Sequence, residues 1–388
     1  MRTFLGYRRP DGQVGIRNHV LVIPANAYAS TVAERIARLV PGVIALAHPH
    51  GDAQHSDDTR LTEWTLAGAA ANPNVCAALI VGLDGERGEA ERVLTLATQR
   101  SPGKRFEAVS IQDEGGSIKA IRNGCAIAKD LLRHAANDER SAVPIGELIL
   151  ATQCGGSDST SGMASNPTVG VVSDLLVEHG GTTILAETPE LMGAEHILAR
   201  RARDEAVAQQ LVEIVANVEK AAQHVGATVA GGNPTPGNVE GGLTTIEEKS
   251  LGCIYKGGST IVEEVIGYAD HPTRKGLIVM DTPGHDPISI SGELAGGAQV
   301  CIFTTGRGSP VGNALGPVIK VTANPRTAER MSDNMDFSAA GMIAGAASKE
   351  ALGQELFELT LRVASGELTR AEIIGHTEFA LYRIGPQV

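Results

Sequence analysis

Short apolar runs that alternate with amphipathic segments restrict the fold of this chain more than any other feature of its sequence. In the first third, four apolar runs are each followed by a segment whose apolar residues recur at helical spacing. The runs cover residues 20–24, 43–47, 77–83 and 106–111, and the amphipathic segments cover 30–40, 57–70, 86–98 and 117–136. Strands that alternate with helices in this way predict a parallel sheet with helices on both faces.

The alternation starts again after residue 145, behind a polar, proline-containing stretch at 136–145 that is typical of a linker. We expect strands at 148–152, 183–186, 276–280 and 299–304, and helices at 167–178, 189–223 and 349–364. The predicted fold class is α/β, with two Rossmann-like domains whose parallel sheets are flanked by helices. Their predicted bounds are 1–140 and 146–388, and we expect an active-site cleft between them. Ligands of open α/β sheets bind where the loops after the strands meet.

Charge and composition exclude several classes of protein. The formal net charge of −12 disfavours binding to nucleic-acid phosphates, so we expect no nucleic-acid partner. No apolar run approaches the roughly 18 residues that a membrane helix needs, and residues 1–7 lack the apolar core of a signal peptide. The five cysteines contain no CxxC pair and are typical of free thiols in a reducing compartment. We therefore expect a cytoplasmic protein with no membrane contact.

The first polar loop with chemical potential follows the run at 43–47. It contains His48, His50 and Asp52, two imidazoles and a carboxylate within five residues. These groups can bind a divalent cation, and His50 and Asp52 are the pair that can converge on one ion. The alternative interpretation is a solvated turn with ordinary histidines.

The second polar loop follows the strand predicted at 148–152 and precedes a predicted helix. It contains Cys154, Ser157, Asp158 and, further on, Asn166, among several glycines. Backbone N–H groups at such a helix start can receive a carboxylate or a phosphate. The loop has neither a Walker sequence nor a GxGxxG fingerprint. A glycine-rich helix start without function is the alternative.

Two further regions carry reactive side chains. Glu187 follows the strand predicted at 183–186, where its carboxylate can enter a site at the sheet edge. The segment 230–260 groups Asn238, Thr244, Glu248 and Lys249 with glycines, and Lys249 could pair with a substrate carboxylate or act as a base. A loop of this length is usually functional. An exposed helix capped by Thr244 or Thr245 is the alternative interpretation.

Two polar loops also follow the strands predicted at 276–280 and 299–304. The first contains Asp286, and the second contains Arg307, a residue that can hold a carboxylate through two parallel hydrogen bonds. The four other cysteines have apolar surroundings and are expected in the core; they are Cys76, Cys125, Cys253 and Cys301.

Six motifs occur in an order that is similar to the altronate/galactarate dehydratase family. They are Gly6-Tyr7 to Arg17-Asn18, the His48-Pro-His50-Gly turn, Cys154-Gly-Gly-Ser-Asp158, Glu187-Thr-Pro-Glu190 with Gly193-Ala-Glu195-His196, Glu248-Lys-Ser-Leu-Gly252, and Phe303-Thr-Thr-Gly-Arg307-Gly308. The resemblance covers the chain from about residue 6 to 345 and concerns the large catalytic region of that family.

The resemblance implies a lyase that removes water from a sugar acid such as altronate or galactarate. Such enzymes remove the proton next to the carboxylate and the β-hydroxyl group, which yields a 2-keto-3-deoxy acid. They use a divalent metal, typically Fe²⁺. The catalytic candidates are His48, His50, Glu187 and Lys249, and the substrate-binding candidates are Cys154, Ser157, Asp158, Asn166, Asn238, Thr244, Glu248, Asp286 and Arg307.

This chain departs from the family pattern in two respects. No SAF-type segment precedes residue 6, so we expect a separate small SAF-type subunit, as in split altronate dehydratases, within a homo- or hetero-oligomer. Tyr28, Asp52 and Gly85 stand where the family commonly has cysteine. Because a carboxylate such as Asp52 suits a hard ion, Mg²⁺ or Mn²⁺ is the alternative to Fe²⁺.

Two other functions remain open from the sequence. A large subunit of a sulfolactate sulfo-lyase would use the same proton abstraction with sulfite as the leaving group. A non-catalytic subunit that binds sugar acids would explain the missing cysteines, although it would not need so many reactive groups.

Overall fold

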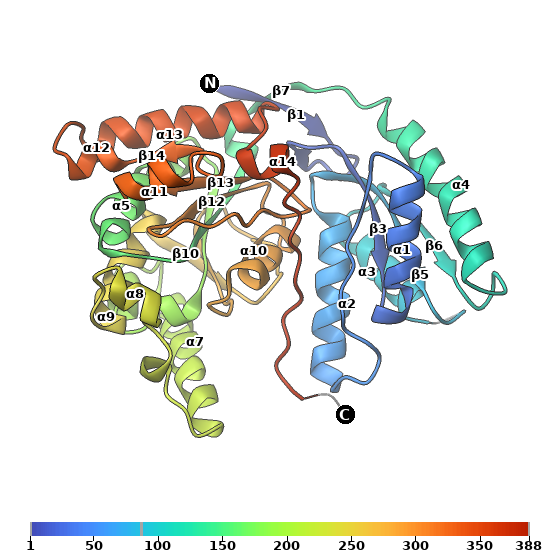
Figure 1. Cartoon of the computed structure of the whole chain (residues 1–388), viewed down its shortest axis with the longest axis horizontal. Coiled ribbons are helices and arrows are strands. Elements are labelled where there is room, and N and C mark those ends of the chain that lie inside the picture. The colour runs from blue at the N-terminus through green and yellow to red at the C-terminus, as the bar shows by residue number, and fades with distance from the viewer. Residues whose placement is uncertain (1, 86–87, 387–388) are drawn as a thin grey trace.

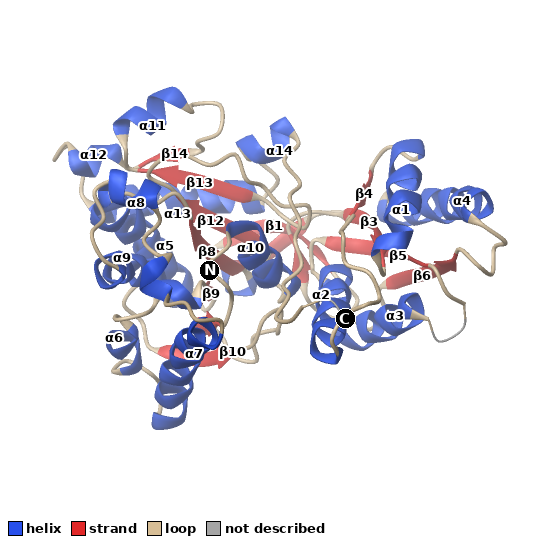
Figure 2. Ribbon diagram, turned by 60° about the horizontal axis from the view of Figure 1, so that its bottom comes forward, coloured by secondary structure: helices blue, strands red, loops and turns tan. Residues whose placement is uncertain are grey.

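Residues 2–85 and 88–386, which the computed structural model describes, fold into three β-sheets with helices packed around them (Figure 1). Two of the sheets are parallel and flanked by helices, so the predicted α/β class is confirmed (Figure 2).

The smaller parallel sheet has four strands in the order β4-β3-β5-β6. Its strands are β3 (His19–Pro24), β4 (Val43–Ala45), β5 (Val75–Gly82) and β6 (Arg105–Ser110). Helices α1 (Ala27–Leu39) and α4 (Ser117–Ala135) cover one face, and α2 (Ser56–Ala71) and α3 (Glu89–Arg100) cover the other (Figure 2). All eight residues of β5 are buried, which explains its uninterrupted apolar sequence. The first two residues of the helix predicted at 86–98 lie outside the described residues.

The larger parallel sheet has seven strands in the order β10-β11-β9-β8-β12-β13-β14. Its strands are β8 (Ile149–Cys154), β9 (Thr182–Leu185), β10 (Val262–Ile266), β11 (Gly276–Met280), β12 (Val300–Thr304), β13 (Val318–Thr322) and β14 (Phe337–Ser338). The helices around it include α5 (Asn166–Glu178), α10 (Asp286–Ala295), α11 (Pro325–Arg330), α12 (Ala340–Ile343), α13 (Lys349–Ala364) and α14 (Arg370–Ile374). All four strands and two of the three helices predicted for this part are present. Strands β10, β13 and β14 are additional.

The stretch predicted as a linker, residues 136–145, connects the two parallel sheets and is partly a strand. Strand β7 (Ser141–Pro144) pairs antiparallel with β1 (Thr3–Arg8), and β1 also pairs with β2 (Val14–Gly15). Val143 is fully buried in a hydrophobic cluster that also contains residues of β8 and α13. This burial holds the stretch in place despite its polar composition.

The prediction of one long helix at 189–223 was wrong. The segment forms two helices, α6 (Glu195–Ala199) and α7 (Glu205–His224), and the short turn η3 (Thr188–Glu190) precedes them. Gly193 has a left-handed φ of 84°, and Ala202 forms a β-bridge to Val262. Both features are incompatible with continuous helix. Asp204 caps the start of α7, because its carboxylate accepts a hydrogen bond from the Val207 N–H at 3.0 Å.

Segment 230–260 contains two helices in place of the expected open loop. They are α8 (Pro236–Glu240) and α9 (Ile246–Cys253), and the turn η5 (Ile254–Gly257) follows directly. Thr245 caps α9, because its side chain accepts a hydrogen bond from the Glu248 N–H. For the backbone of this segment, the structure therefore confirms the alternative interpretation, a helix capped by Thr245.

The two parallel sheets are joined by a shared core and by the C-terminal segment. One hydrophobic cluster contains Leu66 of α2 and Ile80 of β5 together with Leu294 of α10 and Phe303 of β12. The C-terminal segment runs alongside α2 (Figure 1). There, the N–H groups of residues 384 and 385 donate to the two carboxylate oxygens of Asp58 at 2.6 and 2.9 Å.

Candidate active site

A buried cluster of acidic, basic and thiol side chains lies at the carboxyl edge of the seven-stranded sheet. Strand β8 ends in Cys154, and the segment after β9 supplies Glu187 and Glu190. The other members come from α9 and η5, and the cluster consists of Cys154, Glu187, Glu190, Lys249, Cys253 and Lys256. Each of these side chains is at most 8% exposed. The cluster thus brings together side chains from segments that follow different strands of the seven-stranded sheet.

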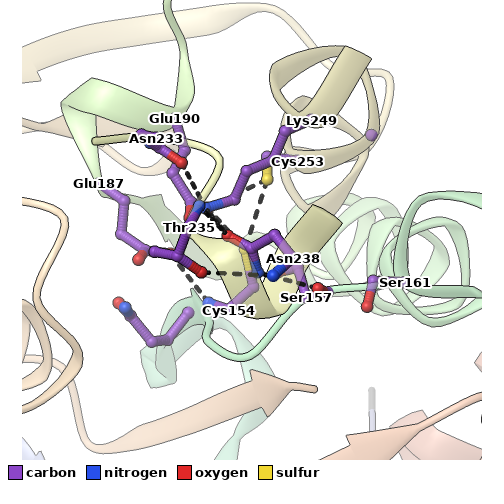
Figure 3. A network of polar contacts seen from close by, with 12 residues as sticks. Cys154, Ser157, Ser161, Glu187, Glu190, Asn233, Thr235, Asn238, Lys249 and Cys253 are labelled. Carbon is purple, nitrogen blue, oxygen red and sulfur yellow. Dashed lines mark hydrogen bonds and ion pairs between the residues drawn. The ribbon is translucent and has the colours of Figure 1, made fainter. Parts of the chain in front are cut away.

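Glu190 occupies the middle of the cluster. Its Oε2 accepts hydrogen bonds from the thiols of Cys154 at 2.7 Å and Cys253 at 3.0 Å, while its Oε1 lies 2.7 Å from Lys249 Nζ. Figure 3 shows Lys249 and Cys253 reaching this point from the same helix. The two residues are four positions apart in α9, so they share one helix face.

Lys256 connects the second carboxyl group to the first thiol. Its Nζ lies 3.0 Å from Glu187 Oε2 and 2.9 Å from Cys154 Sγ, and the side chain has no solvent exposure. The Cys154 N–H also donates to Glu187 Oε2 at 2.8 Å. Among the described residues, the other oxygen of Glu187, Oε1, is buried without a hydrogen-bond partner. An unpaired buried carboxyl oxygen is costly, and it is a feature that functional sites retain.

The backbone at Glu187 is strained. This residue has a φ of 66°, in the left-handed region that non-glycine residues rarely adopt, and its N–H donates to Thr282 Oγ1 at 2.8 Å. Strain of this kind occurs where the surrounding structure forces a side chain into a working position.

The two carboxyl groups of the cluster have opposite pKa shifts. Burial, together with the neighbouring Glu190, raises the pKa of Glu187 to about 8. Burial alone would also raise the pKa of Glu190, but Lys249 and Lys256 lower it to about 2. The pKa of each of these two lysines is raised, because nearby acidic groups outweigh the effect of burial. The cluster therefore combines a protonated and an ionised carboxyl group with two ammonium groups at neutral pH, an arrangement suited to acid–base catalysis.

Three members of the cluster form a group that could hold a metal ion. The ligand atoms of Cys154, Glu190 and Cys253 all lie within 4.8 Å of one another. Two sulfur atoms and one carboxylate suit a softer ion such as Fe²⁺ or Zn²⁺ better than Mg²⁺. Metal binding would have to deprotonate the thiols, since burial raises the pKa of Cys154 well above its usual value.

The loop with the two histidines lies apart from this cluster. His48 is buried and its Nε2 is 2.9 Å from the carbonyl oxygen of Pro24, and burial lowers its pKa to about 4. The His50 N–H donates to His48 Nδ1, and Asp52 accepts from the Tyr28 hydroxyl at 3.3 Å. In residues 2–85 and 88–386, no hydrogen bond or ion pair joins this loop to the cluster. The assignment of a metal to His50 and Asp52 stays a prediction.

Several predicted substrate-binding residues surround the cluster. Asn238 Oδ1 accepts from Lys249 Nζ at 3.4 Å, and Asn238 Nδ2 donates to the carbonyl oxygen of Ser157 at 2.9 Å (Figure 3). Asn166 binds the Gly252 carbonyl at 3.0 Å, directly before Cys253. Burial, with a contribution from Glu190, raises the pKa of Asp286 to about 6.

Other predicted residues lie further out. Thr244 donates its N–H to Glu248 at 2.8 Å, and both groups are exposed at the start of α9. Arg307 is exposed as well, and its Nη2 is 3.7 Å from Glu240. A cavity of about 600 Å³ lies between the two α/β halves, but none of the predicted site residues lines it.

Sequence reasoning missed three members of the cluster. Cys253 was expected to be an ordinary core residue; it is buried, but its thiol lies 3.4 Å from that of Cys154. Glu190 was assigned no chemical role, and Lys256 was not considered. The spacing of Lys249 and Cys253 was a usable signal, because residues four apart on a helix face the same way.

Two family models together match most of the chain. Residues 145–387 match the family model "D-galactarate/Altronate dehydratase, C-terminal", and residues 6–136 match "D-galactarate dehydratase/Altronate hydrolase, second domain". No helix in the described part of the chain is both long and apolar enough to cross a membrane.

Similar proteins are lyases. The chain is 39% identical over 385 residues to the (2R)-sulfolactate sulfo-lyase subunit beta of Chromohalobacter salexigens, covering 99% of this chain and 98% of that protein. It is 35% identical to the altronate dehydratase of Bacillus subtilis, with coverage of 99% and 78%, and 34% identical to the galactarate dehydratase (L-threo-forming) of Escherichia coli, with coverage of 99% and 77%.

The α/β fold, the buried acid–base cluster and these relatives define an enzyme of the lyase class. Within that class, the chain belongs to the D-galactarate/altronate dehydratase family.

Proposed function

We propose that this chain is the catalytic subunit of a lyase that eliminates a β-substituent from a small 2-hydroxy acid. The observation that carries the proposal is the buried cluster around Glu190, in which two carboxyl groups of opposite protonation lie beside two ammonium groups. A substrate reaches such a site at the carboxyl edge of a parallel sheet.

The reaction begins with removal of the proton at the carbon next to the substrate carboxylate. Negative charge then develops on that carboxylate, and the ammonium groups of Lys249 and Lys256 stabilise it. We assign this proton transfer to Glu187 in its ionised form, which a pKa of about 8 leaves as a minor population at neutral pH. Its Oε1 is the accepting atom, because it is buried and has no partner among the described residues. The bond to the β-substituent breaks, the leaving group departs with its electron pair, and the resulting enol tautomerises to a 2-keto acid.

A divalent metal held by Cys154, Glu190 and Cys253 would act as a Lewis acid on the substrate carboxylate. The two sulfur donors favour Fe²⁺, as the family resemblance implies, over Mg²⁺ or Mn²⁺. His48 and His50 remain proposed catalytic residues whose loop would have to approach the cluster.

Two leaving groups are candidates. Water would leave from a sugar acid such as altronate or galactarate, which is the reaction that the names of three relatives describe. Sulfite would leave from sulfolactate, and sequence identity favours this second candidate. The chain is 39% identical to the sulfo-lyase subunit and 32–35% identical to the dehydratases. Because that relative is named as a subunit, we also propose a separate small SAF-type subunit as partner, in a cytoplasmic homo- or hetero-oligomer.

The test measures metal content and 2-keto product for protein purified anaerobically, alone and with the candidate small subunit. Substrates are an aldonate, an aldarate and sulfolactate. Glu187→Gln should lower kcat by about 100-fold or more, the effect of losing an acid–base group. The matched variant Glu355→Gln changes an exposed glutamate outside the cluster and should retain full activity. Binding of these acids without any product would instead indicate the non-catalytic subunit.

A further inference from the structure

A second polar pocket opens beside the cluster, with a volume of about 530 Å³. Four segments form its walls: the loop at 157–161, the end of α8 at residues 240–241, the loop at 305–308, and α11 with the residues that flank it. Asn324 joins the first of these to α11, since its Nδ2 donates to Asp158 Oδ2 at 2.8 Å and its Oδ1 caps α11. Thr327 joins α11 to the loop at 305–308, because its hydroxyl donates to the Gly306 carbonyl at 2.6 Å. The pocket is therefore built from mutually anchored walls.

Three arginines line this pocket in a chain that carries a net charge of −12. Arg326 and Arg330 are four residues apart on α11, so two like charges share one helix face, an arrangement that disfavours the helix. Arg307 lies in the opposite loop. In the described part of the chain, the guanidinium groups of Arg326 and Arg330 have no hydrogen-bond or ion-pair partner. Unpaired guanidinium groups gathered in a pocket are suited to a carboxylate or a sulfonate.

The two carboxylates that line the pocket leave this positive charge largely available. Asp158 is buried and already accepts hydrogen bonds from Thr160, Ser161 and Asn324. Glu240 is exposed and lies 3.7 Å from Arg307 Nη2. An exposed ion pair at that distance is weak and exchangeable. An anionic ligand could therefore replace Glu240 at Arg307.

Helix α8 separates the pocket from the catalytic cluster by a single layer of chain. The guanidinium group of Arg307 packs against Gly237, in the space that a Cβ atom on residue 237 would need. The next residue, Asn238, bonds to Ser157 on one side and to Lys249 on the other. Asn238 therefore lies between Lys249 of the cluster and the part of α8 that contacts Arg307.

We propose that Arg307, Arg326 and Arg330 form a subsite for a second anionic group of the substrate, so that the enzyme selects dianionic 2-hydroxy acids over monoanionic ones. The proposal rests on the function proposed above, with the reacting carboxylate in the cluster. The second group is a carboxylate or a sulfonate at the far end of the acid.

Binding of two matched acids to the full chain tests this subsite without turnover. Malate carries a second carboxylate, and 2,4-dihydroxybutanoate replaces it by a neutral hydroxymethyl group. Isothermal titration calorimetry should give a Kd for malate about tenfold lower, as expected for one charge-assisted contact of roughly 1.4 kcal/mol. Arg326→Gln combined with Arg330→Gln should abolish this preference. Glu240→Gln should strengthen malate binding, because the competing carboxylate is removed.

The control variant is Arg35→Gln, an exposed arginine of α1 far along the chain, which should leave the preference unchanged. Equal affinity for the two acids in the unmodified protein would overturn the proposal. Inorganic phosphate is the third probe. If phosphate binding depends on Arg326 and Arg330 while the two acids bind equally, the pocket is a separate anion site and the proposal is wrong.

The outcomes also separate the subsite from the catalytic proposal. An arginine-dependent preference for malate in a protein that forms no 2-keto product would support the subsite and refute the lyase assignment. Product formation without any charge preference would refute only the subsite.

Discussion

Replacement of Lys249 by methionine should destabilise the protein strongly, because it leaves a buried charge without its main partner. Lys249 Nζ lies 2.7 Å from Glu190 Oε1, and the two side chains are only 8% and 6% exposed. At an effective dielectric constant of about 20, this pair attracts by about 6 kcal/mol, much of which offsets the cost of removing both charges from water. In Lys249→Met the attraction is lost while the desolvated Glu190 remains. We expect a loss of about 3–5 kcal/mol in the free energy of unfolding.

The double variant Glu190→Gln/Lys249→Met separates the ion pair from general damage to the site. It removes both charges, so its stability should return to within about 2 kcal/mol of the unmodified protein. Urea denaturation followed by circular dichroism measures both values without adding salt that would screen the charges. A chelator in the buffer ensures that no metal contributes.

An exposed ion pair provides the matched control. Lys275 lies 3.4 Å from Glu147, with side chains 57% and 43% exposed. Lys275→Met should change stability by less than about 1 kcal/mol. If Lys249→Met costs no more than this control, or if the double variant is as unstable as the sum of its single changes, the electrostatic account of the cluster is refuted.

Three further predictions follow from the same structure. Cys154→Ser and Cys253→Ser should each remove most bound metal, as measured by mass spectrometry of the elements, whereas His50→Asn should not; the reverse result would move the metal to the histidine loop. Burial lowers the pKa of Lys104 to about 7, so between pH 7 and its ordinary value near 10.5 the unfolded chain binds more protons than the folded one. The free energy of unfolding should therefore rise with pH across this window by up to about 1.4 kcal/mol per unit, and Lys104→Met should flatten the rise; an unchanged slope would contradict it. Asn74 makes four buried hydrogen bonds to backbone groups of both halves, so Asn74→Ala should cost about 3 kcal/mol in urea denaturation, and a cost below 1 kcal/mol would show that these bonds contribute little.

Local sequence patterns predicted most of the fold. Strand β5 was predictable because a fully buried strand needs an unbroken apolar sequence. Strand β7 was not, since it depends on pairing with β1 more than 130 residues earlier, and local composition carries no information on that partner. The break between α6 and α7 was missed for a similar reason, because the bridge from Ala202 to Val262 is non-local.

The candidate site was predicted in part. Cys154, Glu187 and Lys249 were identifiable because each occupies a polar segment, and Cys154 and Glu187 lie at or just after the ends of predicted strands. Cys253 was not, because its apolar neighbours are typical of the core and only the folded chain places its thiol 3.4 Å from Cys154. The role of Lys256 was not predictable either. A lysine with no solvent exposure is rare, and the acidic residues that compensate its charge come from another part of the chain.

The contact between Asp58 and the C-terminal segment has a consequence for how the protein is made. Asp58 lies in the first turn of α2, and its partner N–H groups follow 326 and 327 residues later. At a synthesis rate of about 5–20 residues per second, Asp58 is synthesised roughly 16–65 s before residue 384. Any folding of the smaller sheet during this interval leaves the carboxylate without these two partners. The returning segment can close over α2 only after the larger sheet has been synthesised, so this contact is a late event in the formation of the protein.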